Sequence, residues 1–213
     1  MSHDNELVAM AFAPGEHCPP AFLIGVDVMK IQVPMRGATD GVASFLNTVG
    51  ETTVSVCDPP ISPLTLSSPA PAPFACSLAL KLTAAEKRLV SSDVPESVAL
   101  DRFYLIWTIK EAYTKAIGLG LGFDPSRIEY DISPNTVAVD GVIASGWLFE
   151  SSQVTVDGEA YRVTVAQFVG NGHGRGSVVP LCQSQIVCSD ASYFVRKALR
   201  QLKGKELEDA GDK

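Results

Sequence analysis

Apolar residues recur at intervals of three and four between positions 101 and 117, a spacing that predicts a long helix with one buried face. Asp101 is a candidate N-cap for this helix. Gly118 follows its last turn and suits the left-handed backbone that ends many helices. The apolar positions of the predicted face are Leu105, Ile109, Ala112, Tyr113 and Ala116.

The opposite face of the same helix carries polar residues. Glu111 and Lys115 are four positions apart and therefore share a face, which Thr108 extends toward the N-terminus. An ordinary surface pair would explain this pattern and would add only about 0.2–0.5 kcal/mol to helix stability. The pattern alone does not indicate chemistry.

An apolar run from Phe22 to Met29 predicts a core strand, and Asp27 is the one acidic residue within it. A buried carboxylate is unfavourable unless a cation or hydrogen-bond donors neutralise it. Asp27 therefore either caps a turn or meets a backbone amide, or it serves as a metal ligand at the end of the strand.

Further elements give an α+β pattern. A strand is predicted over Glu6–Phe12, and Thr83-Ala-Ala-Glu86 is a capping box that predicts a short helix. Gly118–Gly122 follows a helix and lacks a Gly-Lys-Ser/Thr sequence, so it predicts a turn rather than a phosphate loop. Alternating segments predict antiparallel strands near 127–132, 146–156 and 162–168, with a hairpin turn at Asp157-Gly158 and a charged helical tail over 189–213.

The middle of the chain is rich in proline. Thr39-Asp40 predicts the cap of a helix that runs to about position 49. Residues 58–76 contain many prolines with serine and alanine, which disfavour regular helices and central strands. We interpret residues 58–76 as an inserted surface segment.

Composition narrows the class of protein. The 213 residues carry a net charge of −7 and give a pI of about 4.9, which argues against a general nucleic-acid binder or a protein of anionic membranes. The five cysteines form no Cys-x-x-Cys pair, a usage typical of reduced thiols in the cytoplasm.

Two motifs in order, Gly25-Val26-Asp27 and Trp107-Thr-Ile-Lys-Glu-Ala-Tyr-Thr-Lys115, resemble the signatures of the 4′-phosphopantetheinyl transferase superfamily. The resemblance covers roughly residues 2–170. It implies an α+β lobe in which an antiparallel sheet packs against a long helix. It also implies transfer of the 4′-phosphopantetheine arm of coenzyme A to a serine of an apo acyl or peptidyl carrier protein, in the manner of a holo-[acyl-carrier-protein] synthase, with release of adenosine 3′,5′-bisphosphate.

The resemblance implies a Mg²⁺ site. Asp27 and Glu111 would be its two carboxylate ligands, and Asp4 a third, direct or through water. Many bacterial relatives carry another acid two positions after the aspartate, where this chain has Met29. Met29 is typical of eukaryotic members.

The resemblance also implies roles for other residues. Lys115 would stabilise the phosphate, and either Glu111, through water, or His3 would accept the serine proton. Lys110 would lie beside coenzyme A or the carrier protein. Ser2-His3 matches the end of a family segment that contacts coenzyme A, and Lys30 and Arg36 are the nearest candidates for the nucleotide phosphate.

The expected organisation is a remnant of an N-terminal lobe (1–20), a transferase domain (21–170) and a C-terminal loop with a helical tail (171–213). The two-lobed relatives have nearly a whole lobe before the segment that matches Ser2-His3, so we expect a partial gene model or a fragment. Two hypotheses remain beside an active transferase. One is a non-catalytic lobe that binds carrier protein or coenzyme A without turnover, and the other is a chance match of an unrelated α+β protein.

Overall fold

The computed structural model describes residues 1–12, 23–32, 81–90, 94–170 and 174–210. It divides into two compact units, Met1–Leu181 and Cys182–Lys213. The second unit contains α5 (Ala191–Ala210), in agreement with the predicted helical tail. The predicted helix near positions 39–49 and the proline-rich segment 58–76 lie outside the described residues. No helix among the described residues is both long enough and apolar enough to span a membrane.

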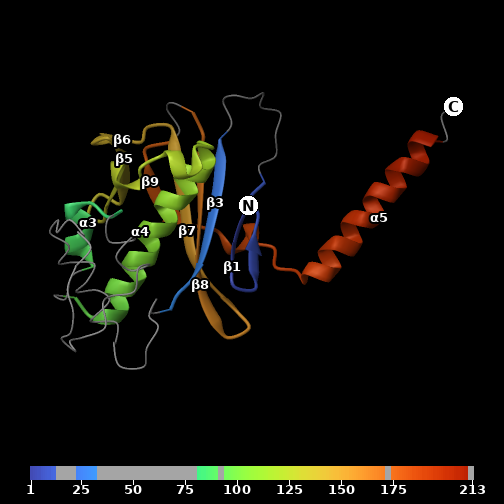
Figure 1. Cartoon of the computed structure of the whole chain (residues 1–213), viewed down its shortest axis with the longest axis horizontal. Coiled ribbons are helices and arrows are strands. Elements are labelled where there is room, and N and C mark those ends of the chain that lie inside the picture. The colour runs from blue at the N-terminus through green and yellow to red at the C-terminus, as the bar shows by residue number, and fades with distance from the viewer. Residues whose placement is uncertain (13–22, 33–80, 91–93, 171–173, 211–213) are drawn as a thin grey trace, which may run out of the picture. The chain divides into compact units, whose positions relative to one another are not determined.

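One sheet of seven strands organises the described part of the first unit (Figure 1). All its pairs are antiparallel except the parallel pair of β7 and β9. The strand order is β3 (Ile24–Lys30), β8 (Glu159–Phe168), β7 (Trp147–Val156), β9 (Ser177–Pro180), β5 (Thr136–Val139) and β4 (Ile128–Asp131), with β6 (Val142–Ile143) paired to β5.

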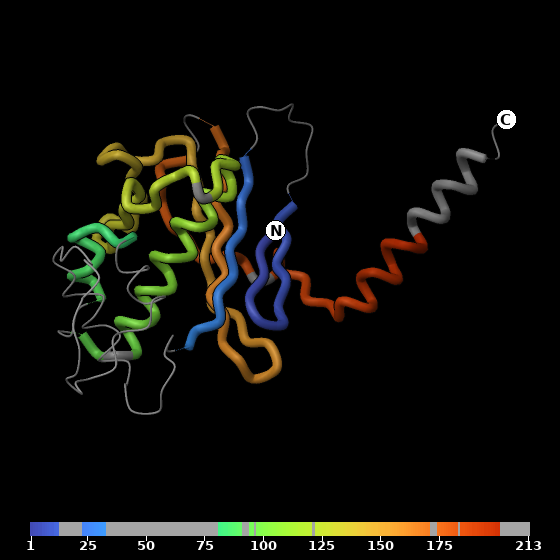
Figure 2. The backbone as a smooth tube through the Cα atoms, viewed as in Figure 1, coloured from blue at the N-terminus to red at the C-terminus, as the bar shows by residue number. Residues whose placement is uncertain are grey.

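The chain begins with a hairpin rather than the single strand predicted over Glu6–Phe12. Strands β1 (Ser2–Asp4) and β2 (Leu7–Ala9) pair through a turn in which Asn5 has a φ of 50°. Asparagine tolerates this left-handed conformation, so the turn falls where the strand was expected to begin. The hairpin lies beside β3 (Figure 2).

The long helix α4 (Glu96–Ala116) packs across the sheet against β3 and β8. It begins after Pro95, so the prediction of Asp101 as N-cap is wrong; Asp101 lies inside the helix and accepts a hydrogen bond from Arg162. Gly118 follows the C-cap with a φ of 71°, which confirms the predicted end of the helix. The short helix α3 (Ala84–Leu89) begins with the predicted capping box.

The core lies between α4 and the sheet. The apolar face of α4 supplies Ile106 and Ile109, which are fully buried, as is Phe149 on β7. Tyr113 packs its ring 4.6 Å from that of Trp147. Burial of this face stabilises the helix on the sheet, because each large apolar side chain removed from water contributes about 1.5–3 kcal/mol. The described part of the chain therefore has the expected α+β fold.

Candidate active site

Strand β3 and helix α4 make direct backbone contact at Gly25. A Cβ atom added at Gly25 would lie 2.1 Å from the carbonyl oxygen of Ala112 and 2.5 Å from the amide nitrogen of Ala116. Only glycine fits this close approach without moving the backbone. Asp27 is two residues further along β3, so its side chain points to the same face, under the helix.

Asp27 forms a compact polar group with one residue of α4 and one of β1. Its Oδ1 accepts hydrogen bonds from Lys115 Nζ at 2.5 Å and from Ser2 Oγ at 2.9 Å. Lys115 Nζ also donates to Ser2 Oγ at 2.8 Å. Burial raises the pKa of the Asp27 carboxyl, and the charge and hydrogen bond of Lys115 oppose this increase.

The second carboxylate oxygen of Asp27, Oδ2, is buried without a hydrogen-bond partner among the described residues. Asp27 as a whole is only 2% exposed. Buried carboxylate oxygens are almost always satisfied by donors or cations. An unsatisfied oxygen beside a second acid is the donor type that a hard divalent cation such as Mg²⁺ binds.

That second acid is Glu111, one helical turn before Lys115. Burial raises the pKa of the Glu111 carboxyl, and the negative charge of Asp27 raises it further. The structure thus brings Asp27 and Glu111 within electrostatic reach of each other. A bound cation would relieve their repulsion, so the two acids fit the expected metal. Within the described ranges, no group of three or more His, Cys, Asp or Glu residues forms a metal site.

The other expected residues of the N-terminal strand form no hydrogen bond with this group in the described structure. Asp4 Oδ2 accepts a hydrogen bond from the amide of Lys30 at 2.6 Å, so it is already used to hold β1 against β3. His3 is exposed. Because side chains alternate along a strand, His3 points to the face opposite Ser2, which argues against His3 as the base.

Lys110 corrects an expectation drawn from the helix. Its ammonium lies 2.8 Å from Glu86 Oε2 and donates to the carbonyl oxygens of Pro125 and Ile128. The residue is 0% exposed, and burial lowers the pKa of its amine while the charge of Glu86 opposes that change. Lys110 therefore ties α4 to α3 and β4 and offers no charge to coenzyme A or a carrier protein.

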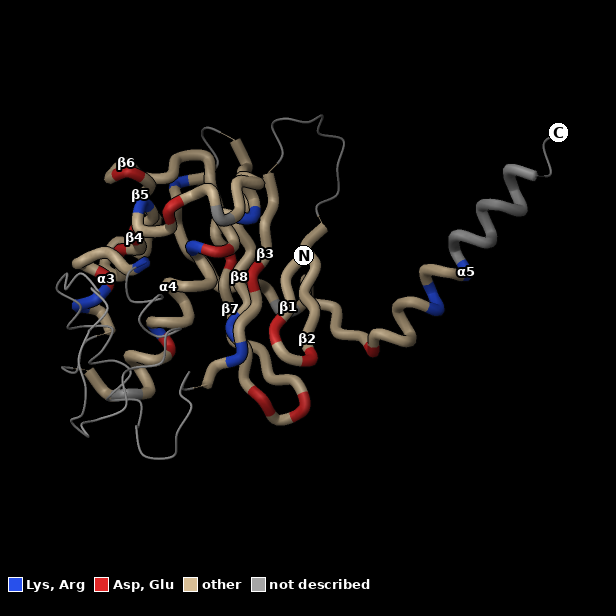
Figure 3. Tube along the Cα trace, in the orientation of Figure 1, with Lys and Arg blue, Asp and Glu red and all other residues tan. Residues whose placement is uncertain are grey.

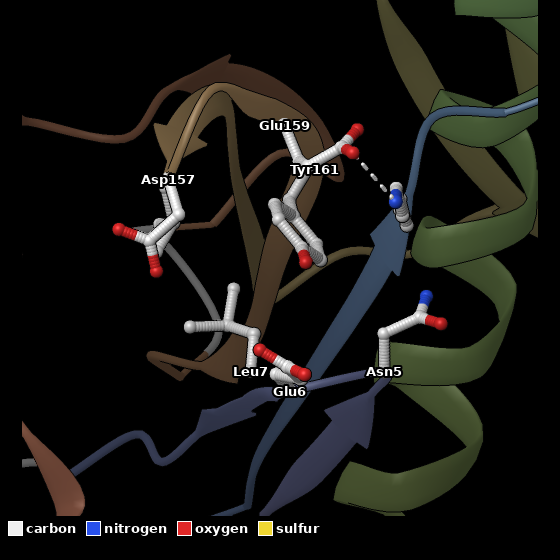
Figure 4. A pocket seen from close by; sticks show the side chains of 8 residues that line it. Asn5, Glu6, Leu7, Asp157, Glu159 and Tyr161 are labelled. Atoms are coloured by element: carbon white, nitrogen blue, oxygen red, sulfur yellow. Dashed lines mark ion pairs between the residues drawn. The ribbon is translucent and has the colours of Figure 1, made fainter.

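Lys30 lines a separate pocket of about 310 Å³ (Figure 4). Its ammonium pairs with Glu159 Oε1 at 3.1 Å. Figure 3 shows acidic positions at the β1–β2 turn and at the β7–β8 hairpin, the two segments that border this pocket. Their excess negative charge makes the pocket a poor match for a nucleotide phosphate. Arg36 lies outside the described residues. The lining residues are Asn5, Glu6, Leu7, Lys30, Val156, Asp157, Glu159 and Tyr161.

A row of buried hydroxyls beside Asp27 was not anticipated from the sequence. Thr164, on β8, is the register partner of Asp27 on β3 and of Ser151 on β7. Its Oγ1 lies 2.7 Å from Thr108 Oγ1 and 2.9 Å from Ser151 Oγ. Thr108 belongs to the polar stripe of the helix, which was the only signal in the sequence that this face meets polar groups.

Comparison with known proteins decides the family. The family model described as "4′-phosphopantetheinyl transferase superfamily" matches residues 66–166. The 4′-phosphopantetheinyl transferase pptA of Paxillus involutus is 39% identical over 203 residues, which cover 95% of this chain and 65% of the relative. This chain belongs to the 4′-phosphopantetheinyl transferase superfamily.

Mammalian members of the superfamily also match. The L-aminoadipate-semialdehyde dehydrogenase-phosphopantetheinyl transferases of Mus musculus and Homo sapiens are each 26% identical over 165 residues, covering 72% of this chain and 41% of the relative. The chain thus spans about two thirds of the length of the fungal relative and two fifths of the length of the mammalian ones.

Proposed function

We propose that this chain transfers the 4′-phosphopantetheine arm of coenzyme A to a serine of an apo carrier protein. The serine oxygen bonds to the phosphorus of the arm, and the bond to adenosine 3′,5′-bisphosphate breaks. The observation that supports this proposal best is the group formed by Asp27, Glu111 and Lys115, in which the second oxygen of Asp27 has no protein partner among the described residues.

Asp27, through Oδ2, and Glu111 would hold Mg²⁺ in this proposal. When bound, the ion offsets the negative charge of the pyrophosphate of coenzyme A, which otherwise repels a nucleophile. Asp4 is not needed as a protein ligand, because Mg²⁺ commonly binds one or two carboxylates and completes its shell with water and phosphate oxygens.

Lys115 and Glu111 supply the remaining chemistry. The Lys115 side chain is 32% exposed, so its ammonium can face a phosphate while it contacts Asp27. A fixed positive charge at that point stabilises the charge that develops during transfer. Glu111 accepts the serine proton at a carboxylate oxygen, directly or through water.

The test is incubation of the chain with coenzyme A, Mg²⁺ and an apo carrier protein, followed by intact-mass measurement of the carrier. The mouse and human relatives are named for L-aminoadipate-semialdehyde dehydrogenase, so that enzyme is tested beside acyl and peptidyl carrier proteins. We expect the mass to rise by one phosphopantetheine arm.

Isosteric variants make the test specific to the site. Asp27→Asn and Glu111→Gln should abolish the mass increase while circular dichroism shows a folded protein. Asp140→Asn changes an exposed acid paired with Arg127 and should be fully active. Transfer at the normal rate by both site variants would reject the proposal.

Binding of carrier protein or coenzyme A without turnover is the second candidate function. The commitment of Lys110 to Glu86 and of Lys30 to Glu159 favours carrier-protein binding over coenzyme A binding within this alternative, since both cations were expected to serve coenzyme A. Calorimetry distinguishes the two functions: heat of binding with no change in carrier mass supports this alternative.

A further inference from the structure

We propose that Ser2 is a positioning residue that keeps the Lys115 ammonium on one oxygen of Asp27, so that the other oxygen remains open to a divalent cation. This inference rests on the magnesium site of the proposed function. It concerns what the hydroxyl of Ser2 does within the protein, rather than any contact of Ser2 with coenzyme A.

The hydroxyl of Ser2 is hydrogen-bonded to both other members of the group. It donates a hydrogen bond to Asp27 Oδ1 at 2.9 Å and accepts a hydrogen bond from Lys115 Nζ at 2.8 Å. Lys115 Nζ contacts that same Oδ1 at 2.5 Å. The three groups form a closed triangle on one side of the carboxylate, and Ser2 is only 6% exposed.

Ser2 is held in this place by its own strand. Two residues later, Asp4 Oδ2 accepts a hydrogen bond from the amide of Lys30 at 2.6 Å. Strand β1 is therefore fixed to β3 at both ends, once at Asp27 and once at Lys30. The bond from Lys30 to Asp4 and the pairing of β1 with β2 hold Ser2 beside Asp27 independently of the side chain of Lys115.

The consequence for a cation follows from the geometry of the carboxylate. An ammonium has three donors, and without a second acceptor beside Oδ1 it can move between the two oxygens of Asp27. At Oδ2 the ammonium would repel a divalent ion and occupy the oxygen that the ion needs. Ser2 supplies the second acceptor on the Oδ1 side and so separates the two positive charges.

The experiment measures binding of Mg²⁺ alone to the full chain, from the rise in melting temperature as MgCl₂ is added. Ser2→Ala should weaken Mg²⁺ binding about tenfold, as expected for loss of a hydrogen bond to a charged group. Ser2→Thr keeps the hydroxyl and should restore the affinity. Ser151→Ala is the matched control. It removes a buried hydroxyl, as Ser2→Ala does, but the Ser151 hydroxyl contacts neither Asp27 nor Lys115.

A double-mutant cycle tests the route through Lys115. In a Lys115→Ala background the competing ammonium is gone, so adding Ser2→Ala should change the Mg²⁺ affinity less than twofold. Wild-type affinity in Ser2→Ala, or the same tenfold loss with and without Lys115, would overturn the role of Ser2. A wild-type protein whose melting temperature does not respond to Mg²⁺ would instead reject the magnesium site of the proposed function, and the role of Ser2 with it.

Discussion

Gly25 and Ala112 approach closely through their backbones. A Cβ atom added to Gly25 would lie only 2.1 Å from the carbonyl oxygen of Ala112. Gly25 belongs to the first sequence motif and Ala112 to the second. The contact explains why a glycine stands two residues before Asp27: it sets the distance between strand and helix at which Asp27 reaches Lys115 and Glu111.

Gly25→Ala should therefore reduce both stability and transfer activity. The new methyl group would force β3 and α4 apart, and overpacking of this kind destabilises proteins by about 1–3 kcal/mol. Chemical denaturation measures the stability, and carrier mass measures the transfer. Gly122→Ala is the control, because a Cβ there meets no atom within 4 Å. Equal stability of the two variants would show that the contact at Gly25 relaxes without effect.

Lys110→Met should lower the free energy of unfolding by about 3–5 kcal/mol, because it leaves the carboxylate of Glu86 buried without its cation. Lys30→Met removes a more exposed ion pair with Glu159 and should change stability by less than about 1 kcal/mol. Urea denaturation measures both values. A Lys110 variant that is as stable as wild type but has a raised KM for coenzyme A would return Lys110 to the binding site.

The contrast between Lys110 and Lys115, the two lysines of α4, shows what the sequence could reveal. Periodicity identified the buried face of α4 and the shared face of Glu111 and Lys115, because these features depend on positions within one helix. The partner of Lys110 is Glu86 on another helix, and no local pattern connects them. The contact of Ser2 with Asp27 likewise joins residues distant in the chain.

The elements that sequence reasoning missed are short strands and the first turns of α4, which begin without a side-chain cap. Strands β5, β6 and β9 have two to four residues, too few for an alternating pattern to stand out. The start of α4 after Pro95 was missed because Asp101 is a stronger N-cap residue, yet Asp101 instead pairs with Arg162 on β8. The hairpin at Asp157-Gly158 was found because both residues favour the positive φ values that the turn has.

Tyr104 should make stability fall between about pH 10 and pH 12. Its hydroxyl donates to the carbonyl oxygen of Gln32 at 2.5 Å, and burial raises its pKa from 10.0 to about 12. In this interval the folded protein keeps the phenol proton that the unfolded chain loses, so the stability present below pH 10 decreases as the pH rises. The loss is on the order of 2 kcal/mol by pH 12.

Urea denaturation at pH 9 and pH 11 measures this effect. Tyr104→Phe has no phenol proton and should lose less stability between the two values than wild type. Tyr193→Phe, at an exposed position of α5, should behave like wild type. The same decrease in all three proteins would show that Tyr104 does not govern the alkaline response.

Lys115→Ala should reduce turnover far more than it affects Mg²⁺. The ammonium is the one cation that contacts Asp27 in the described structure, and its removal takes away a fixed positive charge at the proposed phosphate position. Loss of one such charge or donor reduces kcat by about 10²–10³. Mg²⁺ affinity should stay the same or increase, because a like charge beside the ion is gone.

Steady-state transfer assays give kcat, and the thermal titration gives the affinity for Mg²⁺. Lys197→Ala, on the exposed surface of α5, is the control for loss of a lysine. An unchanged kcat would remove Lys115 from the reaction, whereas a large loss of Mg²⁺ affinity would mean that Lys115 holds Asp27 in place for the ion rather than acting on the phosphate.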